Sequence, residues 1–404
     1  MCDSTKFEDV IDFGLNPLVN SLLDTKNQKD GPTIPLVVEQ CQKCFLVQIK
    51  NTVDAKEIYQ NVDYLFFSSD MPNLDIYFRE FAKDVKKRFL KFGDFVVEIG
   101  SNDGIWLYYL MGYKTLGVDP ATNVALRALR KGIMTVPQFF TERLAGQIET
   151  EWGKAKVIMG ANCIAHTNDL RELMRGVDKL LTDDGVFIVE ANYWGDMVKN
   201  KNYALIYHDH FSYFTLKNWI DFSKQYGMRV FDAVIPPAQG DFLNREKKED
   251  PFNIRIFIDR GQRPKTDRMK EILQNEIDTN LHSLETAQRY EKEVRADAKR
   301  LGDLIRKLKA EGAKIAGYGA AAKGFSILKL ADIDERHIDY FVDDSPAKQG
   351  KFAPISHIPI ISRREAEHQL PDYFLVTAPN YVNVIIGKEK DFKGHFITVD
   401  SNII

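Results

Sequence analysis

Apolar and polar residues alternate in blocks along the middle of the chain. The run Phe95–Ile99 is apolar except for Glu98 and ends at Gly100, which is typical of a buried strand in a parallel sheet. Comparable runs predict strands over 114–118, 132–136, 156–159 and 186–190. Helical spacing of apolar residues predicts helices over 75–92, 106–110, 123–130, 141–152 and 168–181, the last stopped by a polar turn at 182–185. This alternation predicts a parallel sheet covered by helices.

Further stretches extend the pattern on both sides. Residues 228–234 and 253–258 predict an antiparallel pair that closes the sheet, and the charged stretch 265–311 predicts one or two connecting helices with a single packed stripe. From residue 314 a second α/β pattern begins, with strands over 340–344 and 373–378. We therefore expect an α/β protein in four parts, which are 1–70 (strands and turns), 71–262, a helical connector at 263–312, and 313–404.

Composition narrows the class of protein. A chain of 404 residues is too long for one typical core, and a net charge of −3 gives no electrostatic case for binding nucleic acid or membrane. The first residues lack a signal-peptide layout, and no apolar run approaches the roughly twenty residues of a membrane helix. Four cysteines do not indicate a disulfide framework. We expect a cytoplasmic protein, either a monomer or a homodimer.

The first strand of the parallel sheet leads into a candidate nucleoside site. Nucleoside sites of this kind consist of a strand, a glycine turn, a helix and a second strand that ends in an acidic residue. The glycine lets the ligand approach the backbone, and the acidic side chain accepts hydrogen bonds from the ribose hydroxyls. The residues concerned are Glu98, Gly100, Ser101, Asn102, Asp103, Asp119 and Pro120, joined by Asn162 after a later strand. The turn lacks the dinucleotide fingerprint and is similar to the S-adenosylmethionine (SAM) loop of class I methyltransferases. An ordinary strand–helix–strand crossover is the alternative.

Other candidate residues gather at the same sheet edge. Ligands of such sheets bind beyond the carboxyl ends of the strands, so Glu98, Asp119, His166 and Glu190 are expected together. The following segment, 203–214, is aromatic and contains His208 and His210, which is too polar for a plain core element.

Two smaller motifs suggest further ligands. Cys41 and Cys44 form a Cys-x-x-Cys pair, half of a tetrahedral zinc site, with Cys2 as a third thiol and a vestigial knuckle as the alternative. In the C-terminal part, a glycine turn and a lysine at a helix start would hold a phosphate or pyrophosphate, unless the turn is purely structural. The candidate residues there are Gly317, Tyr318, Gly319, Lys323 and Asp343.

Taken in order, these pieces resemble the nucleotide-sugar C-methyltransferases of branched deoxysugar pathways. The resemblance covers nearly the whole chain and rests on residues 12–20, 41–44, 64–69, 98–104, 162–166, 207–210 and 317–324. It implies an N-terminal zinc module, a central SAM domain of class I fold and a C-terminal Rossmann-like domain that binds the nucleotide sugar. It also implies methyl transfer from SAM to C3 of a nucleotide-linked 4-keto-6-deoxysugar.

The resemblance also implies roles for the histidine segment. His210 is the expected base, Tyr207 and His166 stabilise the enolate, Asp209 orients a histidine or binds a sugar hydroxyl, and Tyr64 closes over the sugar. A base that titrates near neutrality suits proton removal beside a ketone. The alternatives are His166 as a helix cap, His208 as a packed histidine, and Cys163 as a buried core thiol rather than a nucleophile.

Three departures from the family pattern bear on these expectations. The family has two Cys-x-x-Cys pairs, whereas here the lone Cys2 could match only the second member of the first pair. Asp209 replaces the usual Glu, and an insertion at 236–251 replaces a glycine-rich loop and could line the sugar pocket. O- or N-methylation of a nucleotide sugar and a non-catalytic binding or scaffold role remain alternatives. A nicotinamide-dependent reductase is disfavoured by the glycine spacing.

Overall fold

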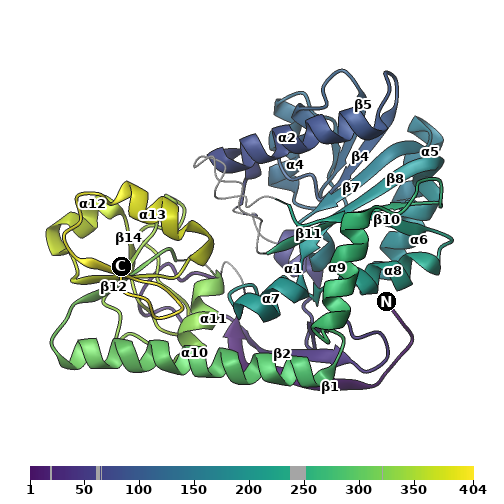
Figure 1. Cartoon of the computed structure of the whole chain (residues 1–404). Coiled ribbons are helices and arrows are strands. Elements are labelled where there is room, and N and C mark those ends of the chain that lie inside the picture. The colour runs from purple at the N-terminus through teal and green to yellow at the C-terminus, as the bar shows by residue number, and fades with distance from the viewer. Residues whose placement is uncertain (19–20, 61–63, 65, 237–251, 321) are drawn as a thin grey trace.

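A computed structural model describes residues 1–18, 21–60, 64, 66–236, 252–320 and 322–404. The chain forms three sheets, two of them in α/β units that lie apart in Figure 1, with the N-terminal sheet and one long helix beneath them. Most of the insertion at 236–251 lies outside the described residues. Within the described part of the chain, no helix is both long and apolar enough to cross a membrane.

The central sheet has seven strands in the order β10-β11-β8-β7-β4-β5-β6. Five of them run parallel, and β11 pairs antiparallel with β8 on one side and with β10 on the other, so the expected closing pair is confirmed. The strands are β4 (Phe95–Ile99), β5 (Lys114–Val118), β6 (Thr135–Val136), β7 (Ala155–Ala161), β8 (Leu181–Asn192), β10 (Arg229–Val234) and β11 (Asn253–Asp259).

The expected turn at 182–185 is wrong, because β8 already begins at Leu181. Leu181 pairs with Ala155, and the register shifts before Val157 pairs with Val186. The polar residues between them occupy that irregular first part of the strand. The turn-forming residues at 182–185 therefore lie at a register shift within β8 and do not form a separate turn.

Helices cover both faces of this sheet. The core on one face is built with α2, α3 and α4, and the core on the other face with α5, α6 and α8. Their bounds are α2 (Pro72–Phe89), α3 (Ile105–Tyr108), α4 (Thr122–Arg130), α5 (Glu142–Trp152), α6 (Leu170–Leu180) and α8 (Leu216–Lys224). These positions agree with the apolar periodicity to within a few residues.

The N-terminal sheet contains a strand from the histidine segment. Its order is β1-β2-β3-β9, with β1 (Phe7–Pro17), β2 (Thr33–Cys41), β3 (Val47–Ile49) and β9 (Ser212–Tyr213). The short helices α1 (Ala55–Tyr59) and η1 (Ser68–Asp70) follow β3 in the chain. Because β9 begins two residues after His210, the sheet anchors the segment that carries the candidate base.

The C-terminal sheet is parallel, in the order β14-β13-β12-β15-β16. Its elements are β12 (Ile315–Tyr318), α11 (Ala322–Leu330), β13 (Phe341–Val342), β14 (Ile360–Ile361), α12 (Arg363–Ala366), β15 (Tyr373–Val376), α13 (Val382–Lys388) and β16 (His395–Ile397), with η4 (Glu367–Gln369) and η5 (Pro379–Tyr381) between them. This parallel α/β unit matches the Rossmann-like expectation.

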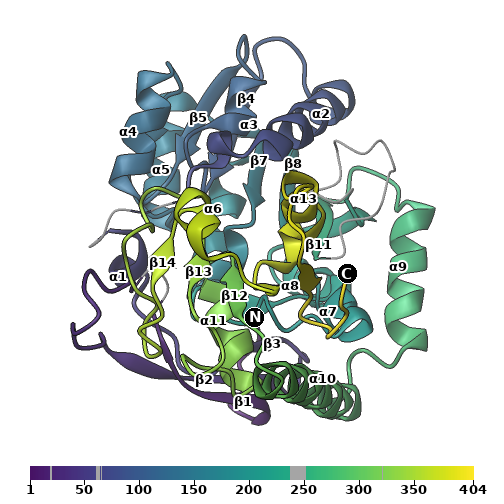
Figure 2. The same ribbon diagram turned by 90° about the vertical axis from the view of Figure 1, so that its left-hand side faces the viewer.

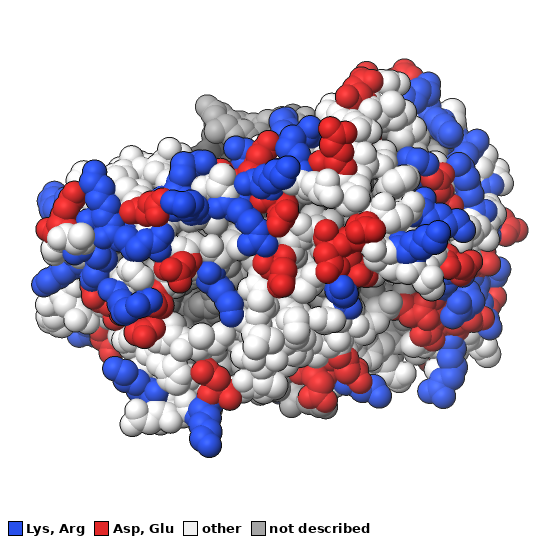
Figure 3. Space-filling view, turned by 90° about the horizontal axis from the view of Figure 1, so that it is seen from below, with Lys and Arg blue, Asp and Glu red and all other residues white. Residues whose placement is uncertain are grey.

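Two connecting helices, α9 (Asp267–Asp278) and α10 (Leu284–Ala310), join the two α/β units. Helix α10 packs against β1 of the N-terminal sheet and continues to α11 of the C-terminal unit, along the bottom of both views (Figures 1 and 2). Its buried stripe includes Tyr290, Val294, Leu301 and Ile305, and Figure 3 shows acidic and basic side chains interspersed on the outward face. A further helix, α7 (Trp194–Asn200), packs Trp194 against Tyr290.

Candidate active site

The loop after β4 brings backbone close to the ligand side of the sheet. Gly100 has φ +64°, and a Cβ on it would lie 2.4 Å from Cys163 Cβ, so glycine is required there for both conformation and space. The Cys163 thiol donates to the Ile99 carbonyl at 3.0 Å, and burial raises its pKa, so it is a packed thiol and not an activated nucleophile.

Two acids lie at this loop. The carboxylate of Asp119 accepts hydrogen bonds from the backbone N–H groups of Asn102 (2.8 Å) and Ala121 (2.9 Å), and burial raises its pKa to about 6. Burial, followed by the charges of Asp119 and Asp103, raises the pKa of Glu98 well above its usual value. Glu98 Oε2 and Ser101 Oγ are buried without a hydrogen-bond partner among the described residues.

These groups fit a nucleoside ligand that carries a positive charge. An unpartnered carboxylate oxygen suits a cationic group, and the remaining lone pairs of Asp119 suit ribose hydroxyls. Glu98, Ser101 and Asp119, with the backbone at Gly100 and Pro120, are therefore the residues that could hold SAM. Asn162 lies beside the next strand with φ +55°, and its side-chain oxygen accepts from Asn253 at 2.9 Å.

Asp103, predicted at the cofactor, is contacted by several side chains of the protein itself. Its carboxylate accepts from the Ser69 hydroxyl, from the Ser69 backbone N–H at 3.1 Å and from Lys131 Nζ at 2.8 Å, and Arg127 lies 3.3 Å away. The side chain is fully buried among these partners. Asp103 thus holds neighbouring segments together. Similarly, the Glu190 carboxylate lies at the expected sheet edge but pairs with Arg255 (2.7 Å) and Tyr77 (2.6 Å).

A segment at 66–71 covers the cofactor loop. The Asn102 side chain accepts from the Ser68 backbone N–H at 2.8 Å and donates to the Phe66 carbonyl at 3.1 Å. Just before this segment, Tyr64 is tied through its backbone to the Asn123 side chain by two hydrogen bonds. Burial, then the charges of Asp209 and Asp119, raise the pKa of Tyr64. The Tyr64 side chain therefore lies near both the cofactor acid and the histidine segment.

His210 is held in one orientation by the loop around it. Its Nδ1 lies 2.7 Å from the Leu205 carbonyl oxygen, and its Nε2 lies 2.9 Å from the Tyr207 hydroxyl, whose ring is 4.2 Å away centre to centre. Since a carbonyl only accepts, Nδ1 carries the proton and Nε2 has the lone pair. The Asn192 amide is also 2.9 Å from Nδ1, and this proton assignment turns its oxygen toward the ring.

His166 lies directly beside His210, with ring centroids 4.8 Å apart at 76°. Burial lowers the pKa of His166 to about 4, so its ring is neutral near pH 7. Burial also raises the pKa of Asp209 to about 7, and its Oδ1 has no hydrogen-bond partner among the described residues. The structure thus brings His166, Tyr207, Asp209 and His210 together, as the resemblance implied.

Tyr59 also belongs to this cluster, although nothing in the sequence indicated it. Its hydroxyl lies 2.6 Å from His166 Nδ1, and its ring is 5.4 Å from that of Tyr64. The contact joins residues 107 positions apart and follows no spacing rule. His208, by contrast, is 1% exposed and packs toward the N-terminal strands, with Asn16 and Ser326 lining the same small cavity.

The C-terminal glycine turn is tightly packed. Cβ atoms on Gly319 and Gly324 would lie 2.9 Å from Ala378 Cβ and 2.8 Å from Thr377 Cβ, and one on Gly317 would meet the Phe341 ring. The Tyr318 side chain, expected at the substrate, is buried in the core, and its hydroxyl donates to Glu389 at 3.0 Å. Tyr318 therefore supports the core of this unit.

Asp343 lies beside this turn. It accepts from the Ala320 backbone N–H at 2.9 Å and from Lys348 Nζ at 3.1 Å. Lys323 belongs to α11, and its side chain lies outside the described part of the structure. A structural role accounts for the packing of the glycines, while Asp343 and Lys348 are polar groups at the carboxyl end of β13.

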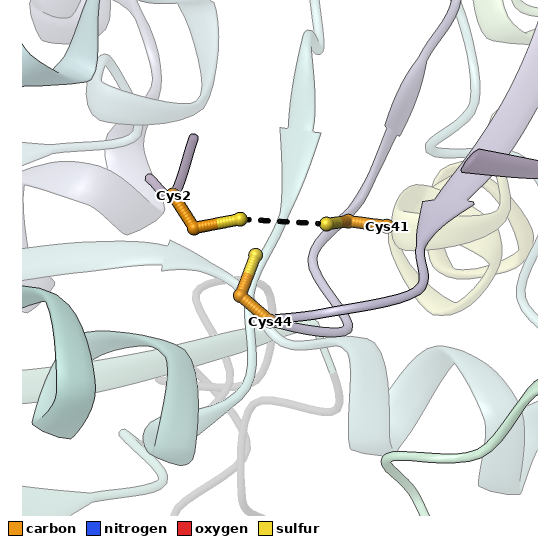
Figure 4. A group of neighbouring side chains, drawn as sticks. All are labelled: Cys2, Cys41 and Cys44. Carbon is orange, nitrogen blue, oxygen red and sulfur yellow. Dashed lines mark hydrogen bonds between the residues drawn. The ribbon is translucent and has the colours of Figure 1, made fainter. Parts of the chain in front are cut away.

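The three N-terminal cysteines converge (Figure 4). The Sγ atoms of Cys2, Cys41 and Cys44 lie within 4.8 Å of one another, and those of Cys2 and Cys41 are 3.5 Å apart. Zn–S bonds of ≈ 2.3 Å in a tetrahedron place sulfur atoms about 3.8 Å apart. The cluster therefore fits three ligands of a zinc ion, and no fourth His, Cys, Asp or Glu joins it among the described residues.

Comparisons with known proteins agree with this arrangement. Family models match residues 1–59 ("Putative zinc binding domain"), 74–232 ("Methyltransferase domain") and 253–399 ("C-methyltransferase C-terminal domain"). The chain is 32% identical over 396 residues to C-methyltransferase NovU of Streptomyces niveus, covering 97% of this chain and 92% of NovU.

Two solved methyltransferase structures each overlap with just under half of the chain. The CcbJ methyltransferase from Streptomyces caelestis is 13% identical, covers 48% of this chain and 99% of its own, and gives a TM-score of 0.35. The plantazolicin methyltransferase BpumL in complex with SAH is 13% identical, covers 47% and 85%, and gives a TM-score of 0.35.

Proposed function

Since the chain belongs to the family of SAM-dependent C-methyltransferases, we propose that it methylates a nucleotide-linked 4-keto-6-deoxysugar at C3, the carbon next to the ketone. SAM supplies an electrophilic methyl group on a sulfonium centre. The remaining chemistry, removal of a proton from carbon and stabilisation of the resulting enolate, falls to side chains of this chain.

The observation that carries the proposal is the asymmetric environment of His210. The Leu205 carbonyl fixes the proton on Nδ1, which leaves the Nε2 lone pair on the side of Tyr207 and the other site residues. Nε2 takes the C3 proton while the electron pair moves onto the ketone oxygen as an enolate. The enolate carbon then forms the bond to the methyl group, and the C–S bond of the donor breaks.

Two neutral donors can serve the enolate oxygen: the His166 N–H, and the Tyr207 hydroxyl, which donates to His210 Nε2 in the free protein and is released when Nε2 takes up the C3 proton. Burial raises the pKa of Tyr207 and lowers that of His166, so near pH 7 one is a phenol and the other an uncharged imidazole. Neutral hydrogen-bond donors stabilise the negative charge that develops on the ketone oxygen. Asp209 and Tyr64 lie within electrostatic reach of each other and are placed to contact sugar hydroxyls.

The C-terminal unit is the proposed site of the nucleotide part. Asp343 and Lys348 at the end of β13 support this assignment. Glu98, Ser101 and Asp119 would hold the donor, as their buried oxygens indicate.

The test is methyl transfer to a panel of keto nucleotide-sugars, followed by mass spectrometry and NMR of the product. We expect one added methyl group on carbon, and SAM-independent exchange of the C3 hydrogen in deuterated water. His210→Ala should lower both rates by about 10²–10⁴-fold, the usual contribution of a general base, while the Kd for SAM changes less than about threefold.

The matched control is His368→Ala, because His368 is exposed in η4 and far from these residues in the chain. It should leave both rates unchanged. A methyl group found on oxygen or nitrogen would show that the protein is an O- or N-methyltransferase and would reject C-methylation. Absence of SAM binding in calorimetry would favour a non-catalytic protein.

A further inference from the structure

Tyr59 reaches the site from an element that precedes the methyltransferase domain. It is the last residue of α1, whose Ile58 is buried in the core shared with the N-terminal sheet. The Asp54 side chain caps the helix by accepting from the Lys56 backbone N–H at 2.9 Å. The Tyr59 hydroxyl therefore has a fixed position, 2.6 Å from His166 Nδ1, with the two rings edge to face at 6.1 Å.

Counting protons decides which partner donates. Tyr59 is a phenol, because burial raises its pKa well above 10, and His166 is a neutral imidazole with a single N–H. A phenol hydroxyl is a stronger hydrogen-bond donor than a neutral imidazole N–H, and the unprotonated imidazole nitrogen is a stronger acceptor than a phenol oxygen. The Tyr59 hydroxyl therefore donates to Nδ1, and the one N–H of the ring lies on Nε2.

We propose that Tyr59 is a positioning residue, which donates to His166 Nδ1 and fixes the neutral Nε2–H tautomer of that ring. This inference rests on the proposed function for its role in catalysis. The Nε2–H that Tyr59 secures is the donor that His166 offers to the ketone oxygen. An imidazole with Nδ1–H would present a lone pair there and repel the enolate.

The same hydrogen bond protects the basicity of His210. The two imidazole rings are 4.8 Å apart, so a positive charge on His166 would lower the pKa of His210 and weaken it as a base. A hydroxyl that donates to Nδ1 opposes protonation at that nitrogen. Tyr59 thus acts on both histidines while contacting only one.

The first experiment reads the tautomer directly in the substrate-free protein. Long-range ¹H–¹⁵N correlation spectra of histidine-labelled protein, with His166→Gln for assignment, should show His166 protonated at Nε2 only. In Tyr59→Phe the two nitrogens should move toward averaged shifts, because the phenol donor is gone. A wild-type ring protonated at Nδ1, or a Tyr59→Phe spectrum identical to wild type, would overturn the proposal.

The second experiment measures catalysis. Tyr59→Phe should lower kcat for methyl transfer by about tenfold, with KM for the acceptor changed less than about twofold, since one hydrogen bond acts through the oxyanion donor. The matched control is Tyr340→Phe, which also loses a buried tyrosine hydrogen bond, to the Gln369 carbonyl at 2.7 Å, but in the C-terminal unit. A kcat equal to that of Tyr340→Phe would reject the catalytic role.

These two experiments separate the inference from the proposed function. The tautomer is measured in the absence of sugar substrate and SAM, so the result does not depend on which reaction the protein catalyses. A fixed Nε2–H tautomer in a protein that methylates oxygen or nitrogen would sink C-methylation and keep the Tyr59–His166 assignment. A fixed tautomer lost in Tyr59→Phe, with kcat unaltered, would reject only the role of Tyr59 in catalysis.

Discussion

Asp119 makes donor binding depend on pH in a defined direction. Burial raises the pKa of its carboxyl to about 6 in the free protein, and hydroxyl donors from a bound ribose would stabilise the carboxylate and lower that pKa. Binding then releases a proton below pH 6. We therefore expect the Kd for SAM to be constant above pH 7 and to rise by up to about tenfold per unit as the pH falls below 6.

Calorimetry across this pH range checks the dependence. Asp119→Asn should bind SAM about 10–100-fold more weakly at pH 8, because hydrogen bonds to a charged group contribute ~1.5–3 kcal/mol. The part of the pH dependence centred near 6 should also disappear in this variant. A wild-type Kd that does not vary between pH 5 and pH 8 would contradict the assignment of Asp119.

At single residues, the sequence predicts position better than orientation. The acidic residue after β5 and the histidines of 203–214 lie where the sequence pattern predicted them. Strand ends and clusters of polar and aromatic side chains can be recognised in a sequence. The hydrogen bonds of Asp103 and the burial of Tyr318 are not visible, since each depends on which residues of other elements come near. Tyr59 was missed for the same reason.

At the level of elements, Asn102 connects the cofactor loop to the segment that covers it. Its φ of +49° suits glycine, so Asn102→Gly keeps the backbone and removes the bonds to Ser68 and Phe66. We expect the Ser68 amide to exchange with deuterium roughly five- to tenfold faster, as the loss of one hydrogen bond of ~1 kcal/mol implies.

Hydrogen–deuterium exchange with fragment analysis measures this effect. Asn200→Ala is the control, since the Asn200 side-chain amide donates to Asp196 within the same helix, α7, at 2.8 Å on the surface. Its exchange at 66–71 should equal that of wild type. Equal exchange at Ser68 in Asn102→Gly would show that the covering segment is held by Asp103 and Arg127 instead.

A buried ion pair braces the antiparallel edge of the central sheet. Arg255 on β11 bonds to Glu190 on β8 and to the Tyr77 hydroxyl on α2, each at 2.7 Å, and stacks on the Phe81 ring at 3.5 Å. Arg255→Met would leave the buried Glu190 carboxylate without its charge partner. We expect the free energy of unfolding to fall by about 3–5 kcal/mol, as for other broken buried pairs.

Urea denaturation of the two single variants gives the comparison. Arg175→Met removes an ion pair with Glu142 in which both side chains are 46% exposed. Such a pair contributes at most about 1 kcal/mol, so this variant should unfold close to wild type. A loss for Arg255→Met no larger than for Arg175→Met would mean that water reaches the Glu190 carboxylate.

For the whole molecule, apolar periodicity was enough to predict most helices and strands but not how the parts combine. β9 lies in the N-terminal sheet although its neighbours in sequence belong to the methyltransferase domain, and two residues are too short to leave a periodic signal. Likewise, the two helices of 265–311 were predictable, whereas the path of α10 along β1 to the C-terminal unit depends on tertiary packing.

The cysteine cluster of the N-terminal module is connected to the candidate base through β3 and β9. Cys41 and Cys44 lead into β3, which pairs with β9 through Val47 and Tyr213. The Cys44 carbonyl also accepts from Asn218 at 2.8 Å. A metal that holds these thiols would therefore stabilise the strand pair beside His210, and its removal should loosen both.

We expect about one zinc ion per chain by elemental mass spectrometry. Burial raises the pKa of Cys44 to about 12, so this thiol needs a metal to ionise near neutrality, and Cys44→Ser should lose the ion. Cys163→Ala, at the fourth cysteine, should retain it. Chelation should lower the rate of methyl transfer more than the affinity for SAM, because β9 adjoins His210 and the cofactor loop lies on another sheet. A metal-free protein with full activity would show that packing alone holds β3 against β9.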